Sequence, residues 1–158
     1  MNKREMDSYS KTENILKNYN KIKKSRELLM EELKSLEEEK QKISKLIMKT
    51  NKVVLKEEDQ NYYYTDETLE NRINELKQFV IKLDAEIEFI NKSLREIEKD
   101  NYYQIITKFY FEKNTVEKIA EEFDTSTQTI YYHKGRLIHE LSYLLSPLDK
   151  IDEIRKMA

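Results

Sequence analysis

Hydrophobic residues recur every seven positions along the first third of the chain. This repeat is typical of a helix with one narrow hydrophobic seam, and it predicts an amphipathic helix over residues of about 12–48. Arg26 and Lys40 occupy two positions that flank the seam, so we expect the helix to pack on a partner helix rather than inside a globular core. The seam consists of Ile15, Tyr19, Ile22, Leu29, Leu33, Leu36, Ile43 and Ile47.

The periodicity is lost over residues 50–65, which predicts a connecting loop. Three consecutive tyrosines, Tyr62 to Tyr64, lie in this loop. They can either pack the loop onto the neighbouring helices or form a contact surface, and the packing role is favoured because tyrosine has a large apolar ring.

A second long helix is expected over residues 66–99. Thr65 or Asp66 is a suitable N-cap, and Glu67 puts a negative charge in the first turn, where it complements the helix dipole. The hydrophobic spacing then alternates between four and three, which is the pattern of a coiled coil. Its seam consists of Leu69, Ile73, Leu76, Val80, Leu83, Ile87, Ile90, Leu94 and Ile97.

Two arrangements satisfy this coiled-coil seam. Mostly β-branched residues at one seam position and mostly leucine at the other favour a parallel two-stranded dimer. The first helix and the 50–65 connection instead allow an antiparallel hairpin within one chain, and a dimer of hairpins would use both. We expect residues 1–99 to form this coiled-coil region and the protein to be a homodimer through it.

The pattern after Asp100 predicts a small globular domain over residues 100–146. Hydrophobic residues crowd into one short helix, after which Asn114 and Thr115 can cap a second helix that ends near Phe123. The first of these helices contains Tyr102, Tyr103, Ile105, Ile106, Phe109, Tyr110 and Phe111.

A turn of three residues, Asp124 to Ser126, leads into a third helix that Ser126 can cap. Asp124 occupies a position that commonly requires a positive φ, which aspartate tolerates. Ala120 permits a close approach between the second and third helices. Pro147 is expected to stop or redirect the third helix, leaving residues 147–158 as a tail or short helix.

Composition agrees with an all-α fold class. The 158 residues include one glycine and one proline, and 38% of them are charged, which is typical of long helices with few tight turns. The net charge is -2, there is no cysteine, and no uncharged apolar run approaches the roughly 18 residues that span a bilayer. We therefore expect a soluble, cytoplasmic protein.

Residues 114–141, NTVEKIAEEFDTSTQTIYYHKGRLIHEL, resemble region 4 of bacterial sigma factors without a gap. The departures are Lys118, Asp124 and Gly135. The resemblance covers about a quarter of the chain, and nothing upstream resembles the other sigma regions. The matched positions are Thr115, Ile119, Ala120, Phe123, Ser126, Ile130, Arg136 and Leu141.

A sigma-region-4-like segment behind a long charged coiled coil resembles the small phage- and prophage-encoded regulators of the ArpU and RinA type, which are linked to late-gene transcription. The resemblance implies a helix-turn-helix that binds double-stranded DNA through helix 126–141 in the major groove. Of the implied contacts, Thr127, Gln128 and Tyr131 are candidates for reading bases, and Tyr132, Lys134 and Arg136 for holding phosphate and sugar. Ser126 belongs to the same DNA-binding set.

The net charge of the predicted domain is unusual for a DNA-binding protein. Residues 101–145 contain five Lys or Arg and six Asp or Glu, which gives -1, whereas an independent DNA-binding domain is usually basic. We therefore expect modest affinity per domain, raised by dimerisation or by RNA polymerase. One alternative is a protein-interaction module that acts on RNA polymerase or another factor. Another is a small-terminase-like DNA packaging protein, which the order of the two modules disfavours.

The sequence does not indicate an enzyme. His133 and His139 are the only histidines, and His133 occupies an inward-facing position, so a structural role is expected. A single glycine excludes a glycine-rich phosphate loop. No cofactor and no metal site are expected.

Overall fold

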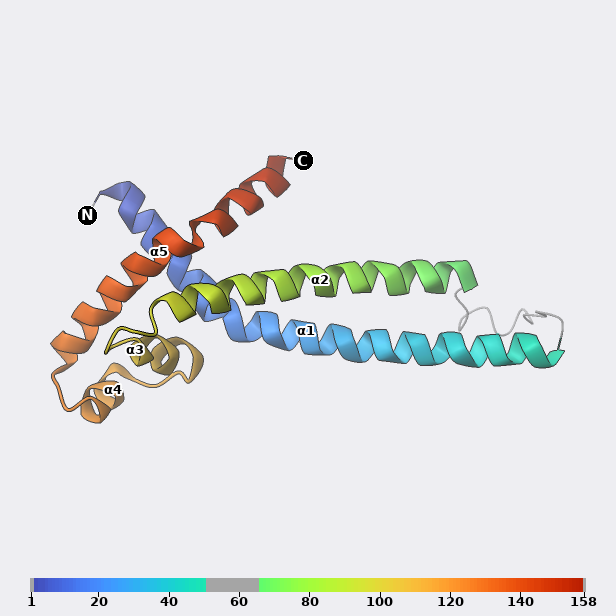
Figure 1. Ribbon diagram of the computed structural model, residues 1–158, viewed down its shortest axis with the longest axis horizontal. Coiled ribbons are helices and arrows are strands. Elements are labelled where there is room, and N and C mark those ends of the chain that lie inside the picture. The colour runs from blue at the N-terminus through green and yellow to red at the C-terminus, as the bar shows by residue number, and fades with distance from the viewer. Residues whose placement is uncertain (1, 51–65, 158) are drawn as a thin grey trace. The chain divides into compact units, whose positions relative to one another are not determined.

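The computed structural model is all-α, which confirms the predicted fold class (Figure 1). It describes residues 2–50 and 66–157, and the side chains of residues 2–46 and 67–148, and no strand occurs in these ranges. The predicted 50–65 loop, with its tyrosines and Thr65, lies outside the described residues apart from Thr50. The elements are α1 (Lys3–Thr50), α2 (Asp66–Glu96), α3 (Gln104–Ile106), the π-helix η2 (Thr107–Phe111), α4 (Val116–Glu122) and α5 (Thr127–Met157).

Helix α1 begins at Lys3, well before the predicted start near residue 12. The backbone N–H of Glu5 donates to the side-chain oxygen of Asn2 at 2.9 Å, and the N–H of Asn2 donates to the Glu5 carboxylate at 3.1 Å. This reciprocal pair satisfies two N–H groups that a helix start otherwise leaves without partners. The cap therefore starts the helix ahead of the hydrophobic repeat.

The described chain forms two compact units, and α1 and α2 contribute to both. Unit 1 contains residues 1–22 and 85–158, and unit 2 contains residues 23–84. This division differs from the predicted boundary between residues 99 and 100. The reason is that the first turns of α1 and the end of α2 belong to the same hydrophobic core as α5.

Unit 2 is an antiparallel pair of helices joined within one chain. Lys40 pairs with Glu70 at 3.5 Å, Lys77 pairs with Glu37 at 3.4 Å, and Arg26 pairs with Asp84. Residue numbers fall along α1 as they rise along α2, so the two helices run in opposite directions. The two predicted seams therefore face each other inside unit 2, as the hairpin alternative requires. The buried residues of this contact are Leu33, Leu36, Leu69, Ile73 and Leu76.

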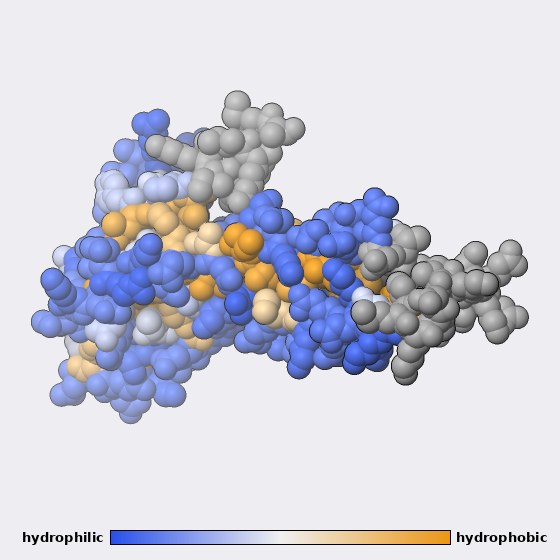
Figure 2. Space-filling model, turned by 45° about the vertical axis from the view of Figure 1, so that its right-hand side comes forward, coloured by the Kyte–Doolittle hydropathy of each residue, from blue (hydrophilic) through white to orange (hydrophobic). Residues whose placement is uncertain are grey.

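The seam of unit 2 remains partly open to solvent. Leu29 and Ile43 on α1 and Leu83 on α2 are only half-buried. Figure 2 shows hydrophobic residues of this unit as a band between hydrophilic helix surfaces. The two helices of unit 2 therefore leave part of their shared hydrophobic seam exposed to solvent.

Unit 1 has a core to which α1, α2, α3, η2 and α5 contribute. Leu16 of α1 is fully buried with Leu141 and Leu145 of α5, and the Tyr19 hydroxyl donates to the Asn91 side chain of α2 at 2.6 Å. Leu16 lies outside the seam predicted for α1. It is buried because α1 meets α5 as well as α2 here, so a wider face of the helix is covered.

Pro147 was expected to stop or redirect the third helix, and it does not stop it, because α5 continues through Pro147 to Met157. A proline inside a helix leaves the carbonyl four residues earlier without its N–H donor. Here that carbonyl belongs to Tyr143, and it accepts a hydrogen bond from the Ser146 hydroxyl at 3.0 Å. The hydroxyl replaces the missing donor and allows the helix to continue.

The short helix predicted around residues 102–111 is present from Gln104 in two parts, α3 and η2. In η2 the N–H of Glu112 donates to the carbonyl of Thr107 at 3.0 Å. The wider π-turn rotates the following side chains relative to an α-helix. None of the helices in the described ranges combines the length and hydrophobicity that crossing a membrane requires.

Candidate functional site

Helices α4 and α5 are joined by a short turn whose local signals match those predicted. The Thr115 hydroxyl accepts from the N–H of Lys118 at 3.2 Å, and the Ser126 hydroxyl accepts from the N–H of Thr129 at 3.2 Å. Asp124 has a φ of 52°. The two predicted caps and the predicted positive φ are therefore confirmed, and together they fix the direction in which α5 starts.

The contact between α4 and α5 is a small hydrophobic cluster. Ile119 and Ala120 of α4 are buried with Ile130 of α5 and with Ile105 of α3. A methyl group at position 120 lets the two helix backbones approach closely. The cluster thus packs against one side of the first turns of α5, and the opposite side of these turns faces outward.

That outward side carries most of the residues predicted to contact DNA. Ser126 and Gln128 are exposed, Tyr131 and Tyr132 are 56% and 68% exposed, and Thr127 is half-buried. Gln128, Tyr131 and Tyr132 lie at spacings of three and four, so they share one face of the helix. The first two turns of α5 therefore present a polar and aromatic surface.

Lys134 does not lie on this surface, and its predicted phosphate contact is not supported. Its side chain is only 12% exposed, and its ammonium lies 3.7 Å from Glu13 of α1 and 4.4 Å from the ring centroid of Phe109. The sequence contained a signal for this, because Lys134 lies four residues after Ile130 and four before Ile138, both of which are buried. The spacing puts Lys134 on the core side of α5.

Glu13 links Lys134 to a further buried group. The Tyr110 hydroxyl donates to the Glu13 carboxylate at 2.6 Å. Burial, followed by this hydrogen bond, raises the pKa of Tyr110. Glu13 of α1 thus receives contacts from η2 and α5, and Lys134 serves to join these elements.

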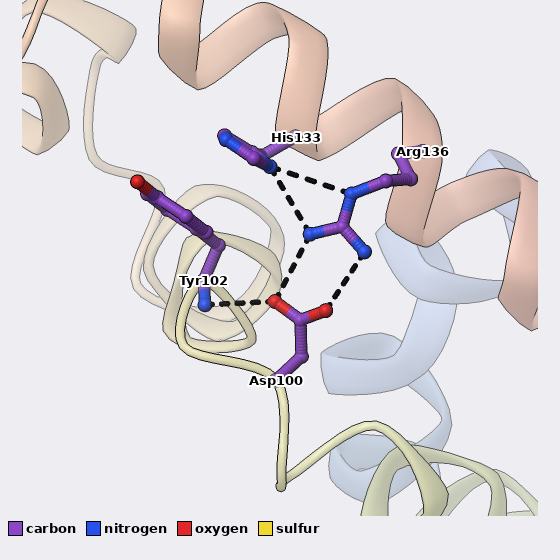
Figure 3. Close-up of polar contacts among 4 residues, drawn as sticks. All are labelled: Asp100, Tyr102, His133 and Arg136. Carbon is purple, nitrogen blue, oxygen red and sulfur yellow. Dashed lines mark hydrogen bonds and ion pairs between the residues drawn. The ribbon is translucent and has the colours of Figure 1, made fainter.

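Arg136, the other predicted phosphate contact from α5, is also bound within the chain (Figure 3). Its Nη1 donates to Oδ2 of Asp100 at 2.7 Å, and its Nη2 donates to Oδ1 at 3.0 Å. The N–H of Tyr102 donates to the same carboxylate at 2.9 Å. Hydrogen bonding by Arg136 lowers the pKa of Asp100, and the carboxylate in turn raises the pKa of Arg136.

His133 completes this cluster and has the packed surroundings predicted for it. Its ring stacks on Tyr102 at 3.6 Å between centroids with an interplanar angle of 8°. Its Nδ1 lies 3.0 Å from Nη2 and 3.3 Å from Nε of Arg136, so Nδ1 is the acceptor and the neutral ring carries its proton on Nε2. Desolvation, followed by the charge of Arg136, lowers the pKa of His133.

The outward surface of α5 from Thr127 to Leu148 therefore has little positive charge. The charged residues from Thr127 to Leu148 are Lys134, Arg136 and Glu140, and both cations are bound to carboxylates. Glu140 is exposed. On α4, Glu122 pairs with Lys108 of η2 at 2.5 Å. Recognition by this surface would rest on hydrogen bonds and ring contacts more than on charge.

Within the described residues, no group of three or more His, Cys, Asp or Glu side chains could hold a metal ion. Comparisons of the chain with models of protein families, with curated proteins and with solved structures give no match.

Proposed function

We propose that this protein is a cytoplasmic, DNA-binding transcription regulator of phage or prophage genes, rather than an enzyme, and that α5 enters the major groove. The observation that carries the proposal is the exposure of Gln128 and Tyr131 on the first two turns of α5, with Ile130 buried behind them. A helix held in this way can present its N-terminal side chains to base edges. The resemblance of residues 114–141 to sigma region 4 supports the same role.

Each exposed side chain has a suitable chemistry for this role. The amide of Gln128 can pair with N6 and N7 of adenine, and the Thr127 methyl can contact the methyl group of thymine. The hydroxyls of Ser126, Tyr131 and Tyr132 can bond to bases or to phosphate and sugar. We withdraw Lys134 and Arg136 from the proposed contacts, because their charges are used within unit 1.

Because Lys134 and Arg136 are not available to contact phosphate, we expect DNA binding to depend only weakly on salt concentration. Each phosphate neutralised by a cation contributes about -0.9 to the slope of log K against log salt concentration. With Lys134 and Arg136 bound to carboxylates, the other cations of residues 101–145 are Lys108, Lys113 and Lys118, so we expect a slope of about -3 or shallower for one domain.

The test is selection of bound duplexes from a random DNA pool by the full-length protein. We expect an enriched sequence motif, and we expect Gln128→Ala combined with Tyr131→Ala to abolish its selective binding. The matched control is Gln78→Ala combined with Phe79→Ala, because these two residues are an exposed glutamine and an exposed aromatic in unit 2. An unenriched pool, or equal losses in both double variants, would refute the proposal.

A second candidate is a protein-binding surface that contacts RNA polymerase. The observation that favours it is the combination of exposed tyrosines with an absence of free cations between Thr127 and Leu148, since tyrosine is enriched at protein interfaces. Direct binding to purified core RNA polymerase without DNA, weakened by Tyr131→Ala and not by Phe79→Ala, would support this role. Binding to neither polymerase nor DNA would exclude both roles.

A further inference from the structure

Helix α5 has a second exposed surface beyond its first turns. His139 and Pro147 are exposed, and Tyr143, between them, is 69% exposed. The rings of His139 and Tyr143 meet edge to face with centroids 5.2 Å apart. The core side of the same stretch is formed by Leu137, Ile138, Leu141 and Leu145. The pair of rings therefore faces away from the core of unit 1.

This second surface is separate from the proposed DNA-contacting surface. An α-helix turns by about 100° per residue, so His139, Tyr143 and Pro147 lie on average about a third of a turn away from Thr127, Gln128 and Tyr131. Tyr132 lies on the same side of α5 as the second surface, about two turns before His139. Two partners can therefore contact α5 at the same time. One would meet its N-terminal turns and the other its C-terminal half.

We propose that the second surface binds a second copy of this chain, with the two α5 helices crossing antiparallel between His139 and Tyr143. An isologous contact requires a surface that complements itself. In this crossing His139 faces Tyr143 of the partner subunit, so the edge-to-face pair becomes a cluster of four rings. His139, Tyr143 and Pro147 are uncharged when histidine is neutral, so the rings that face each other carry no like charges, and the exposed Glu140 lies beside the crossing.

The distance along α5 between the DNA-contacting turns and the second surface favours a second copy of the chain as the partner. This step rests on the proposed function. The DNA-contacting turns centre near residue 130 and the crossing near residue 141, which is about 16 Å along the helix at 1.5 Å per residue. Two antiparallel copies then hold their DNA-contacting turns about 33 Å apart. Half-sites one turn apart on DNA are separated by about 34 Å.

The coiled-coil seam is a weaker candidate for the contact between copies. It was the expected dimer interface, but within unit 2 the seams of α1 and α2 already pack against each other. A parallel dimer would have to separate them. The α5 surface needs no such rearrangement.

The test is sedimentation equilibrium of the full-length protein without DNA, over a wide range of concentration. We expect a reversible dimer, and we expect Tyr143→Glu to raise its dissociation constant by at least about tenfold, because it buries like charges at the crossing. Tyr131→Glu is the matched control on the same helix, and it should leave dimerisation unchanged. A wild-type protein that stays monomeric throughout, or a dimer insensitive to Tyr143→Glu, would overturn the inference.

Cross-linking and DNA selection separate this inference from the proposed function. The chain has no cysteine, so chains with His139→Cys mixed with chains with Tyr143→Cys should form a mixed disulfide dimer in preference to either self-pair. Selected duplexes should contain two half-sites whose centres are about 10 base pairs apart. If the protein forms a dimer that depends on Tyr143 but selects no duplex, the proposed interface stands and the DNA-binding role is rejected.

Discussion

Arg136 of α5 binds the carboxylate of Asp100 through two hydrogen bonds, of 2.7 and 3.0 Å. Asp100 lies in the turn that follows α2, so this pair ties the end of α2 to the middle of α5. The guanidinium also donates to His133, which stacks on Tyr102. An arginine predicted to contact phosphate is thus part of the scaffold that orients the proposed DNA-binding helix.

Asp100→Asn should lower the free energy of unfolding by about 1 kcal/mol at neutral pH, because the ion pair and one charged hydrogen bond are lost at a partly exposed site. Urea unfolding of the full-length protein measures this. Arg136 lowers the pKa of Asp100. The stabilisation is therefore present above the ordinary carboxyl pKa of about 3.9, and it is lost as the pH falls through the folded-state pKa. Glu98→Gln, at an exposed position two residues earlier, should change little.

His133 should make the protein less stable as the pH falls below about 6.5. Its pKa is lowered in the folded state, so the unfolded chain takes up a proton first and unfolding becomes more favourable. His133→Phe keeps a ring against Tyr102 and removes the titrating group. The wild-type protein should lose stability relative to His133→Phe between about pH 7.5 and pH 5.5, and parallel pH profiles would contradict the assigned pKa direction.

Gly135→Ala should raise the free energy of unfolding by about 0.5–1 kcal/mol, because glycine inside a helix costs conformational entropy. A Cβ atom at this position meets nothing within 4 Å. The measurement is again urea unfolding, with Ala120→Val as the contrasting variant. Ala120 is buried between α4 and α5, so the larger side chain should destabilise the protein by about 1–3 kcal/mol.

Leu16→Ala should lower the free energy of unfolding by about 2–4 kcal/mol, because Leu16 is fully buried in the core that α1 shares with α5. Leu28→Ala removes the same atoms from the same helix at a position that is 53% exposed, and it should cost less than about 0.5 kcal/mol. Thermal or urea unfolding followed by circular dichroism distinguishes the two. Similar losses for both variants would show that α1 does not complete the core of unit 1.

The candidate site was predictable where its signals are local. Thr115, Ser126 and Asp124 act on the backbone within three residues of themselves, so their types and positions suffice to predict two caps and a positive φ. The outward position of Gln128 and Tyr131 likewise follows from their spacing relative to Ile130. Lys134 could have been predicted as inward by the same spacing, whereas its partner Glu13 lies far away in the chain.

The sequence by itself determined the all-α class, the two hydrophobic seams and the start of α5, because helix periodicity and capping depend on residues within a few positions of each other. Only the tertiary structure decided that the seams meet antiparallel within unit 2, that Leu16 completes the core of unit 1, and that Asp100 and Glu13 bind Arg136 and Lys134 of α5. These contacts join residues tens of positions apart. Many pairings of such residues satisfy the same periodic pattern, and only the packing of the folded chain selects among them.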